Sequence, residues 1–490
     1  MKKSGFLPRA LLALLMLGAG ACVGKEQVVI FATGRSQGRI GAAEVPGTGG
    51  RKAGGFAVLK KLYDGEKLPK LAVDTGDWFS AVPEGWLTRG RSTVDCFNAV
   101  PYAAAAAGLE DLALSPEEFR KLAESSRVPL LASNLYLTNN KKPPFLTSTR
   151  VVQAGGHGIG FFSAIISSPQ KANRARHLTN YKLEKETFET EKAVKALRDS
   201  GASVVVMLMS VNPKEHADPE FFRDFVAKVS RVDLIITDEP SIKKLYRENR
   251  TWIARAGLEM SEAARLTLDL DRTSGRLTGV HWQAIPLDEL KYGQDTGLMK
   301  IISGYRASAA AHMARRIGHF SAAVPLRDGP DTPAADFAAD CMRRWAKSNA
   351  AIIPLSEPAA GFSSGPVTVG GLYDAFPLDS SVVFVKIRGD DLERTLAGMQ
   401  AADISVSGLR LFLKDGVLER VEGENGPLIP AHVYRVAVPD SLVSGKEHSI
   451  LSTAMEFANS RRYLREVVGW CLSRQKTFPR PEGGRTVKEN

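Results

Sequence analysis

Residues 364–377 read Ser364-Gly-Pro-Val-Thr-Val369-Gly-Gly-Leu-Tyr-Asp-Ala-Phe-Pro377, a turn that leads into a short helix before a proline. A second stretch, Val385-Lys-Ile-Arg-Gly389-Asp-Asp-Leu-Glu-Arg-Thr-Leu396, indicates a strand, a glycine and a helix. The surrounding pattern predicts helices over 332–348, 389–400 and 451–472, and strands over 350–354, 382–388, 409–414, 417–422 and 432–438. Short apolar strands that alternate with helices are typical of an α/β domain.

The N-terminal half shows the same alternation from Gln27 onward. Short apolar runs lie at 28–33, 70–74, 128–132, 158–163, 203–209 and 233–237, and strands this apolar are usually buried on both faces. A predicted hairpin over 265–271 and 278–285 closes this domain, and the helix-rich segment 293–319 follows it as a linker. Because single cores rarely exceed about 250 to 300 residues, a chain of 490 residues is expected to form more than one domain.

The first residues predict export from the bacterial cytoplasm. Lys2, Lys3 and Arg9 precede an apolar run over 10–17 that is too short to span a bilayer. The run ends Leu17-Gly-Ala-Gly-Ala-Cys22, which resembles a lipobox, so residues 1–21 are interpreted as a signal peptide and Cys22 as the lipidated residue. A signal peptidase site ending at Ala21 is the alternative, and it would release a soluble periplasmic protein. We expect an envelope protein that contacts the membrane through its lipid.

Charge and cysteine content limit the classes of partner. The chain has 65 Lys and Arg against 54 Asp and Glu, a net charge of +11, which suits anionic membrane surfaces. The basic residues are scattered and not interleaved with aromatics, so no nucleic-acid partner is expected. Beyond Cys22 the cysteines are Cys96, Cys341 and Cys471, with no metal-type spacing. This number does not indicate a disulfide framework, although one bridge is possible.

The order of these segments resembles the periplasmic 5'-nucleotidase family. Besides the two opening stretches, the resemblance is carried by Ala338-Ala-Asp340-Cys-Met-Arg343, Ser405-Val-Ser-Gly408, Tyr434-Arg-Val-Ala437 and Asp74-Thr-Gly76-Asp77. It implies a four-layer α/β/β/α metallophosphoesterase-like sandwich over 22–290, a linker helix over 291–319 and a smaller α/β C-terminal domain over 320–474. The charged tail over 475–490 is expected to be disordered.

The family holds two divalent cations that activate a water and clamp a phosphoryl group. The resemblance places Asp77 at the aspartate that bridges the two ions. The family's first metal loop, Asp-x-His-Gly, corresponds to Arg35-Ser-Gln37-Gly38, so Arg35 and Gln37 replace metal ligands. An arginine cannot coordinate a cation, because its guanidinium carries a permanent positive charge.

The other metal loops differ as well. The family's Gly-Asn-His-Glu corresponds to Gly108-Leu-Glu110-Asp111, its Ser-His histidine to Val211, and its Gly-His-x-His to Asp238-Glu239-Pro-Ser241. The chain's histidines contain no His-x-His pair, and His216 is interpreted as a loop residue. If the fold is as expected, Glu110, Asp111, Asp238 and Glu239 converge with Asp77 at one sheet edge. They would then form either a salt-bridged cluster around Arg35, which we favour, or a carboxylate site for Mn, Zn, Mg or Ca.

The loops that grip a nucleotide in the family are also changed. Its Asn-x-Gly-x-Arg loop corresponds to 356–362, which has no arginine, its Pro-Phe-x-Asn to 377–380, and its late Gly-Gly-Asp loop to 444–447. Phe362 and Phe376 remain as candidate residues for stacking on a base, with a core position as the alternative for each.

Three functional hypotheses follow. The favoured one is a catalytically degenerate envelope lipoprotein that binds or scaffolds an unknown protein or small molecule and has no cofactor. The second is a metal-dependent phosphoester hydrolase, 5'-nucleotidase-like, with a rebuilt carboxylate site. The third is a receptor or assembly factor of the envelope that uses the space between its domains.

Overall fold

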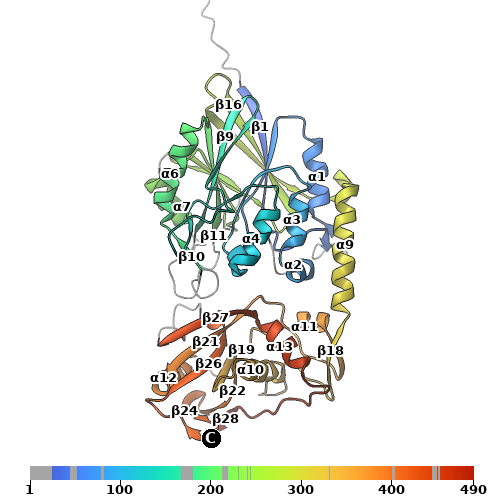
Figure 1. The fold of residues 1–490 in the computed structure, drawn as a ribbon, viewed down its shortest axis with the longest axis vertical. Helices are drawn as coiled ribbons and strands as arrows, with labels where there is room; N and C mark the ends of the chain where they lie inside the picture. Colours follow the sequence, from blue (N-terminus) through green and yellow to red (C-terminus); the bar gives the residue numbers. More distant parts are fainter. Residues whose placement is uncertain are drawn as a thin grey trace, which may run out of the picture.

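A computed structural model describes residues 25–44, 52–78, 82–166, 180–211, 219–229, 231–239, 241–242, 244–329, 331–399, 403–443, 450 and 453–489. Two domains are stacked along the long axis of the molecule, and the helix α9 (Thr296–Met313) runs along one side from the first to the second (Figure 1). The expected signal peptide and Cys22 lie outside the described residues. In the part of the chain that is described, no helix has the length and apolarity needed to cross a membrane.

The N-terminal domain contains two β-sheets that pack face to face. One sheet has the order β17-β16-β1-β4-β5-β6, with β15 beside β1, and the other has the order β13-β14-β12-β11-β9-β8. Their facing side chains, such as Val28 and Ile30 of β1 and Val204 and Val206 of β11, form one apolar cluster. The strands of the first sheet are β1 (Lys25–Gly34), β4 (Lys70–Asp74), β5 (Tyr102–Ala106), β6 (Leu130–Leu131), β15 (Gly257–Leu258), β16 (Glu262–Asp271) and β17 (Leu277–Pro286). Those of the second are β8 (Thr149–Ala154), β9 (His157–Ile166), β11 (Val204–Val211), β12 (Leu234–Thr237), β13 (Leu245–Glu248) and β14 (Thr251–Arg255).

Helices cover the outer face of each sheet. The first sheet is covered by α1 (Phe56–Gly65), α3 (Arg91–Phe97) and α4 (Pro116–Ser125), and the second by α6 (Glu186–Asp199) and α7 (Pro219–Lys228). The short helix α2 (Pro83–Thr88) packs against α3 and α9. Helix α4 begins at Pro116 because the Ser115 side chain accepts from the backbone N–H of Glu118, whose own side chain accepts from the backbone N–H of Ser115. The predicted α/β/β/α sandwich and the hairpin that closes it, β16 with β17, are confirmed.

The C-terminal domain is built on a five-stranded sheet of order β22-β19-β26-β21-β27. One face packs against α10 (Pro333–Ala346), α11 (Val369–Ala375) and α13 (Leu464–Leu472). The other packs against α12 (Gly389–Gly398) and a smaller sheet of order β25-β24-β23-β28. The strands are β19 (Ala350–Pro354), β21 (Ser381–Arg388), β22 (Ile404–Ser407), β23 (Leu409–Lys414), β24 (Val417–Gly423), β25 (Gly426–Pro427), β26 (Val433–Pro439), β27 (Glu456–Tyr463) and β28 (Thr486–Glu489).

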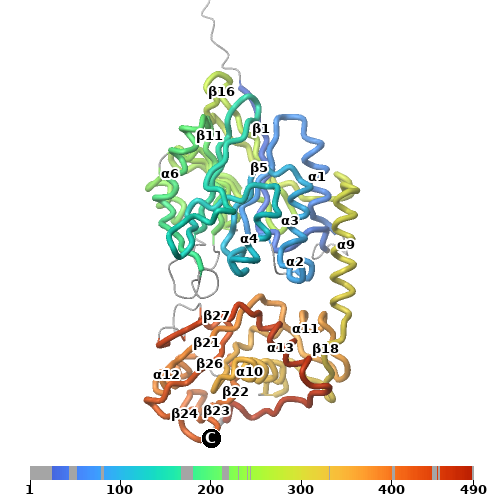
Figure 2. Tube along the Cα trace, in the orientation of Figure 1, coloured from blue at the N-terminus to red at the C-terminus, as the bar shows by residue number. Residues whose placement is uncertain are grey.

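The C-terminal tail is ordered, so the prediction of disorder over 475–490 is wrong for its described part. Figure 2 shows this segment running along the lower side of the C-terminal domain. Phe478 is buried against Phe320 and Phe337, and β28 pairs in parallel with β23 from Leu411 to Lys414. The tail's charged composition predicts disorder, but one buried aromatic and an available strand edge are enough to order it.

Two predicted helices also have different limits. The helix predicted over 451–472 is the strand β27 followed by α13, because residues 456–463 pair antiparallel with β21. The predicted linker helix over 291–319 corresponds to α9, and the strand β18 (Arg316–Phe320) follows it and pairs with β20 (Gly365–Thr368). In both places, pairing with a distant strand overrides the local helical pattern.

One disulfide is present among the described residues. It joins Cys341 of α10 to Cys471 of α13, with the two Cα atoms 5.5 Å apart, and both residues are buried. The third described cysteine, Cys96, is buried and unbonded. The single bridge that the sequence left open therefore exists, and it lies in the core of the C-terminal domain.

The domains contact each other directly through α2 of the first domain and α11 and α13 of the second. The rings of Trp86, on α2, and Tyr373, on α11, have centroids 5.7 Å apart. The guanidinium of Arg89, which follows α2, lies 2.9 Å from a carboxylate oxygen of Glu466 in α13. These contacts fix how the N-terminal domain is placed on the C-terminal one.

Candidate functional site

The loops after β1 and β4 lie side by side at one edge of the first sheet. The backbone N–H of Arg35 donates to the Gly76 carbonyl at 2.9 Å, and that of Gln37 donates to the Asp77 carbonyl at 3.0 Å. Arg35, Gln37 and Asp77 all have left-handed backbone, with φ of 51°, 47° and 59°. Each such residue costs about 1 to 3 kcal/mol, and strain of this kind concentrates at functional sites. The strained residues are the ones that the sequence singles out.

Arg35 is the cation at the centre of this edge. Its Nε lies 3.4 Å from Oδ2 of Asp238, and its Nη2 donates to the Val211 carbonyl at 2.9 Å. Burial alone would lower the pKa of the guanidinium, but the charges of Asp238, Asp77 and Glu239 outweigh burial and raise it. Arg35 therefore stays charged and interacts with three carboxylates, which follow β4 and β12.

Burial raises the pKa of both aspartates that interact with Arg35. Burial raises the pKa of Asp238 to about 6, although Arg35 and the Val211 N–H act in the opposite direction. Burial, together with the charges of Asp238 and Glu110, raises the pKa of Asp77 to about 8. One guanidinium does not neutralise all the carboxylates that surround it.

The remaining candidate carboxylates have different roles. Asp111 accepts three backbone N–H bonds, from Asp77, Trp78 and Gly108 at 2.8–3.0 Å, so both of its oxygens are used to hold the loops. The Glu110 N–H donates to Asp77 at 2.9 Å. Glu239 is buried and accepts one bond from the Ser241 N–H, while its other oxygen has no hydrogen-bond partner among the described residues.

These side chains do not fit a pair of divalent cations. Asp111 is saturated by backbone donors, and Asp238 is bonded to Arg35 and to the Val211 N–H. Within the described ranges, no group of three or more His, Cys, Asp or Glu side chains is placed to hold a metal ion. His216 and the late loop over 444–447 lie outside the described residues.

Asp74, three residues before Asp77, is expected to make the stability of the protein depend on pH. Burial raises its pKa to about 7, against bonds from the Thr33 hydroxyl at 2.7 Å and the Gly76 N–H at 2.8 Å. Because the pKa of Asp74 is higher in the folded state, burying its carboxylate costs nothing below the pKa of the unfolded chain and has its full cost above pH 7. The free energy of unfolding therefore falls as the pH rises between these two values. We expect Asp74→Asn to reduce the loss of unfolding free energy between pH 5 and 8 by about 2 to 3 kcal/mol. Urea unfolding at both pH values measures this difference. A variant that loses as much unfolding free energy between about pH 5 and 8 as the wild type would contradict the prediction.

The candidate stacking residues of the C-terminal domain lie in its core. Phe362 is 6% exposed and Phe376 is 1% exposed, and their ring centroids are 6.4 Å apart in the cluster that α10 covers. Neither ring is available to stack on a ligand. The alternative interpretation, a core position, is correct for both.

Arg465, on α13, lies beside the segment over 376–379, and the sequence analysis did not identify it as a candidate residue. It is fully buried, and its guanidinium lies 4.8–5.4 Å from the ring centroids of Trp86, Tyr373 and Tyr463. Trp86 comes from the N-terminal domain, so the cation lies between the two domains. Arg465 and Glu466 are the charged residues of the segment 464–472, and an arginine next to so many apolar residues is the sequence signal that could have identified it.

Arg465 also holds the segment that corresponds to the family's Pro-Phe-x-Asn. Its Nη1 donates to the carbonyls of Phe376 and Pro377 at 3.1 and 2.9 Å, and it forms an ion pair with Asp379. Leu378, at the family's aromatic position, is exposed. The segment is therefore held by an internal cation of the chain.

Comparison with known proteins finds a family model that matches the C-terminal domain. The family described as "5'-nucleotidase, C-terminal domain" matches residues 310–453. Endonuclease YhcR of Bacillus subtilis (strain 168) is 22% identical over 392 residues, which cover 75% of this chain and 32% of that protein. The chain thus matches about a third of the length of this relative.

Solved structures match over nearly the whole chain. A 5'-nucleotidase precursor from Thermus thermophilus has a TM-score of 0.64 and 18% identity, covering 95% of this chain and 99% of that one. The NAD nucleotidase of Haemophilus influenzae has a TM-score of 0.61 and 15% identity, covering 95% and 100%. The chain therefore has the two-domain fold of the 5'-nucleotidases, and its residues 310–453 match the model of the 5'-nucleotidase C-terminal domain.

Proposed function

We propose that this chain is a catalytically degenerate member of the 5'-nucleotidase superfamily that acts as a binding or scaffold protein of the bacterial envelope. The observation that carries the proposal is the guanidinium of Arg35, which lies 3.4 Å from Asp238 within the group of carboxylates that would otherwise hold cations. A fixed positive charge at this place repels a metal ion and generates no activated hydroxide.

The C-terminal half of the site supports the same proposal. The segment over 376–379, where the family would place its substrate contacts, is bonded to Arg465. Phe362 and Phe376 are buried in the core. A nucleotide would therefore find neither the metal pair nor an aromatic platform at these positions among the described residues.

The envelope location is part of the proposal and rests on two observations. The sequence Leu17-Gly-Ala-Gly-Ala-Cys22 predicts cleavage and lipidation at Cys22, which would attach the chain to a membrane. The buried disulfide between Cys341 and Cys471 supports an oxidising compartment, because such bonds are rare in the cytosol. Labelling with a radioactive fatty acid, and its loss in Cys22→Ala, would test the anchor.

A metal-dependent phosphoester hydrolase is the second candidate, and one observation favours it. Glu239 has a buried oxygen without a hydrogen-bond partner in the described part of the chain, and Asp77, which has strained backbone, interacts with the same guanidinium of Arg35 as Glu239 does. A cation bound by these carboxylates would also fit the hydrolases among the similar proteins.

The test is an assay of the purified mature protein with nucleoside monophosphates and a chromogenic phosphate ester, in Mn, Zn, Mg or Ca. We expect no turnover above background, no stoichiometric metal by elemental analysis, and no change in melting temperature with a chelator. Turnover that Asp77→Asn abolishes would refute the proposal and support the hydrolase. Asp64→Asn, at an exposed aspartate on α1, is the matched control.

A further inference from the structure

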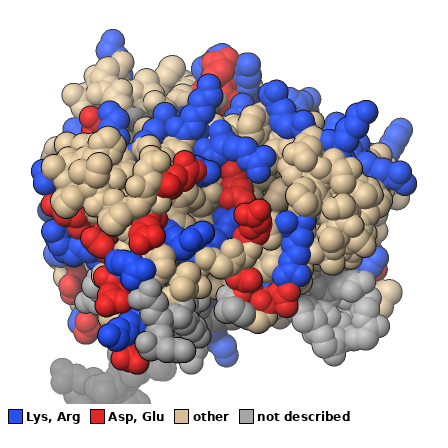
Figure 3. Space-filling model, turned by 90° about the horizontal axis from the view of Figure 1, so that it is seen from below, with Lys and Arg blue, Asp and Glu red and all other residues tan. Residues whose placement is uncertain are grey.

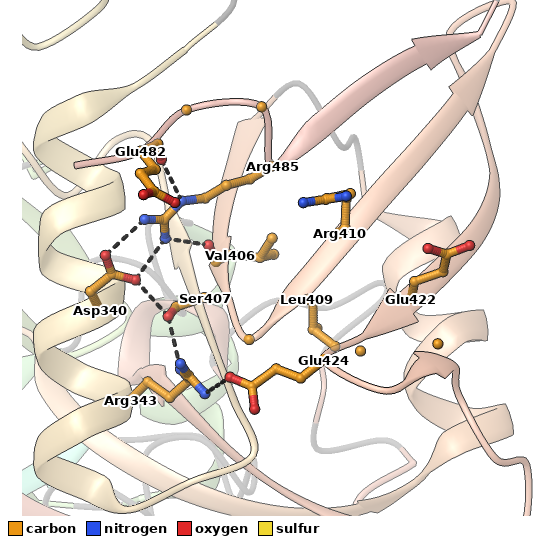
Figure 4. Close-up of a pocket in the computed structure, with 15 residues that line it drawn as sticks. Asp340, Arg343, Val406, Ser407, Leu409, Arg410, Glu422, Glu424, Glu482 and Arg485 are labelled. Atoms are coloured by element: carbon orange, nitrogen blue, oxygen red, sulfur yellow. Dashed lines mark hydrogen bonds and ion pairs between the residues drawn. The ribbon is translucent and has the colours of Figure 1, made fainter.

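The C-terminal domain has a pocket on the side away from the loop over 356–362. Its volume is about 580 Å³, and α10, the β22–β23 turn, β24 and the tail over 482–485 line it (Figure 4). Ser407 in its wall pairs with Ala351 at the start of β19, whereas the loop over 356–362 follows the end of β19. The pocket therefore lies at the opposite end of the sheet from that loop.

One wall of the pocket is a chain of satisfied polar groups. Arg485 forms a two-pronged ion pair with Asp340 at 2.8 and 2.9 Å, and the Ser407 hydroxyl donates to Asp340 at 2.6 Å. Arg343 then donates to Ser407 at 3.0 Å and to Glu424 at 2.8 Å. A wall in which each group is held by its neighbours is pre-organised for a ligand and loses little entropy on binding.

The other wall presents a cation without a partner. Arg410, on β23, is exposed and makes no side-chain hydrogen bond or ion pair with any described residue. Its guanidinium points toward the side of the pocket that carries Arg485 (Figure 4). Glu422, opposite it in the β23–β24 register, is bonded instead to Arg420 at 3.2 Å. A guanidinium in this position suits a carboxylate, which matches its planar fork of donors.

The charge of the lining limits what the ligand can be. Three arginines (Arg343, Arg410 and Arg485) face four carboxylates (Asp340, Glu422, Glu424 and Glu482), which leaves a net charge of −1. A multiply charged phosphate would be repelled by this balance. Figure 3, which views the molecule from the end that the C-terminal domain forms, likewise shows Lys and Arg interspersed with Asp and Glu rather than a field of one sign.

The second free charge in the lining is acidic. The Glu482 side chain makes no hydrogen bond or ion pair within the described residues, and it lies on the tail across from β23 (Figure 4). None of the lining residues is aromatic, so a flat base or ring has nothing to stack on. A ligand that satisfies both free groups has a carboxylate for Arg410 and an ammonium for Glu482.

We propose that this pocket binds a small zwitterion, an amino acid or short peptide, with its carboxylate on Arg410 and its ammonium group on Glu482. The volume lies within the range of ligand pockets, and two charge-assisted contacts in opposite directions also fix the orientation of the bound molecule. The site is separate from the Arg35 cluster, so it does not depend on whether the chain hydrolyses phosphoesters.

The test is calorimetric titration of the full-length mature protein with amino acids and di- and tripeptides that have free termini. Parallel arms use the same peptides amidated at the C-terminus or acetylated at the N-terminus, and inorganic phosphate. We expect millimolar or tighter binding of a free peptide, at least about tenfold weaker binding after either blocking group, and no binding of phosphate.

Two variants test which residue of the pocket binds which charged group of the ligand. Arg410→Gln should weaken carboxylate binding at least about tenfold, and Glu482→Gln should do the same for the ammonium contact, because each removes one charge-assisted bond. Arg394→Gln, at an exposed arginine of α12 outside the pocket, is the matched control and should bind as the wild type does. Circular dichroism checks that each variant folds. Failure of all peptides to bind, binding that survives Arg410→Gln in a folded protein, or preference for phosphate would overturn the proposal.

Discussion

Replacing both members of the disulfide, Cys341→Ala with Cys471→Ala, should destabilise the C-terminal domain by about 3 to 5 kcal/mol. The bond closes a loop with a sequence separation of 130 residues, and a cross-link over so long a loop removes much of the entropy of the unfolded chain. For a domain of this size the melting temperature should fall by about 10 °C. Differential scanning calorimetry measures this directly, because the transition of the N-terminal domain should stay in place.

Two controls separate the cross-link from the loss of side-chain volume. Cys96→Ala removes a buried sulfur that is not in a disulfide, so its effect should be confined to the N-terminal transition. A reducing agent should lower the melting temperature of the wild type and leave that of the double variant unchanged. Equal melting temperatures for the oxidised wild type and the double variant would contradict the predicted effect.

Arg465→Ala should destabilise the protein by about 3 to 5 kcal/mol, because it leaves Asp379 without its cation and empties the space among three aromatic rings. It also removes the donor that holds the carbonyls of Phe376 and Pro377. Because Trp86 lies on the other domain, the variant should loosen the domain arrangement as well. Chemical unfolding gives the stability, and small-angle scattering reports the change in arrangement.

Arg462→Ala is the matched control for this prediction. Its guanidinium is largely exposed and lies 4.0 Å from Glu466, so its removal should cost less than about 1 kcal/mol. A double variant, Arg465→Met with Asp379→Leu, should recover part of the loss, since it removes both charges and fills the space. An Arg465→Ala protein as stable as Arg462→Ala would show that the buried cation contributes little.

Local sequence patterns predict those elements whose stabilising contacts are close in the sequence. The hairpin of β16 and β17 is predictable because Asp271 caps its own turn, accepting the Ser274 N–H at 2.7 Å, and Gly275 takes a positive φ of 68°. By contrast, residues 456–463 form β27 through pairing with β21, about 75 residues earlier in the chain. No nearby residue carries that information, so the local pattern predicts a single helix there.

In the candidate site, too, the local sequence predicts some residues, while others depend on partners that are distant in the chain. The positions of Arg35 and Asp238 after apolar strands predict that the two residues converge, and the structure brings them to 3.4 Å. The expected single sheet edge is wrong, because Arg35 follows β1 of the first sheet and Asp238 follows β12 of the second. Arg465 was missed because its partners, Trp86 and the segment over 376–379, are distant in sequence. An arginine's neighbours decide whether it is solvated or buried, and the sequence of α13 alone does not name them.

Arg35 has one more consequence for the N-terminal domain. The positive charge beside Asp238 is covalently part of the chain, so it has no dissociation constant and does not vary with the supply of trace elements. A protein that uses a bound ion at this position loses part of its folding energy in an ion-poor medium. This domain keeps the contribution of Arg35 in a medium that lacks metal ions.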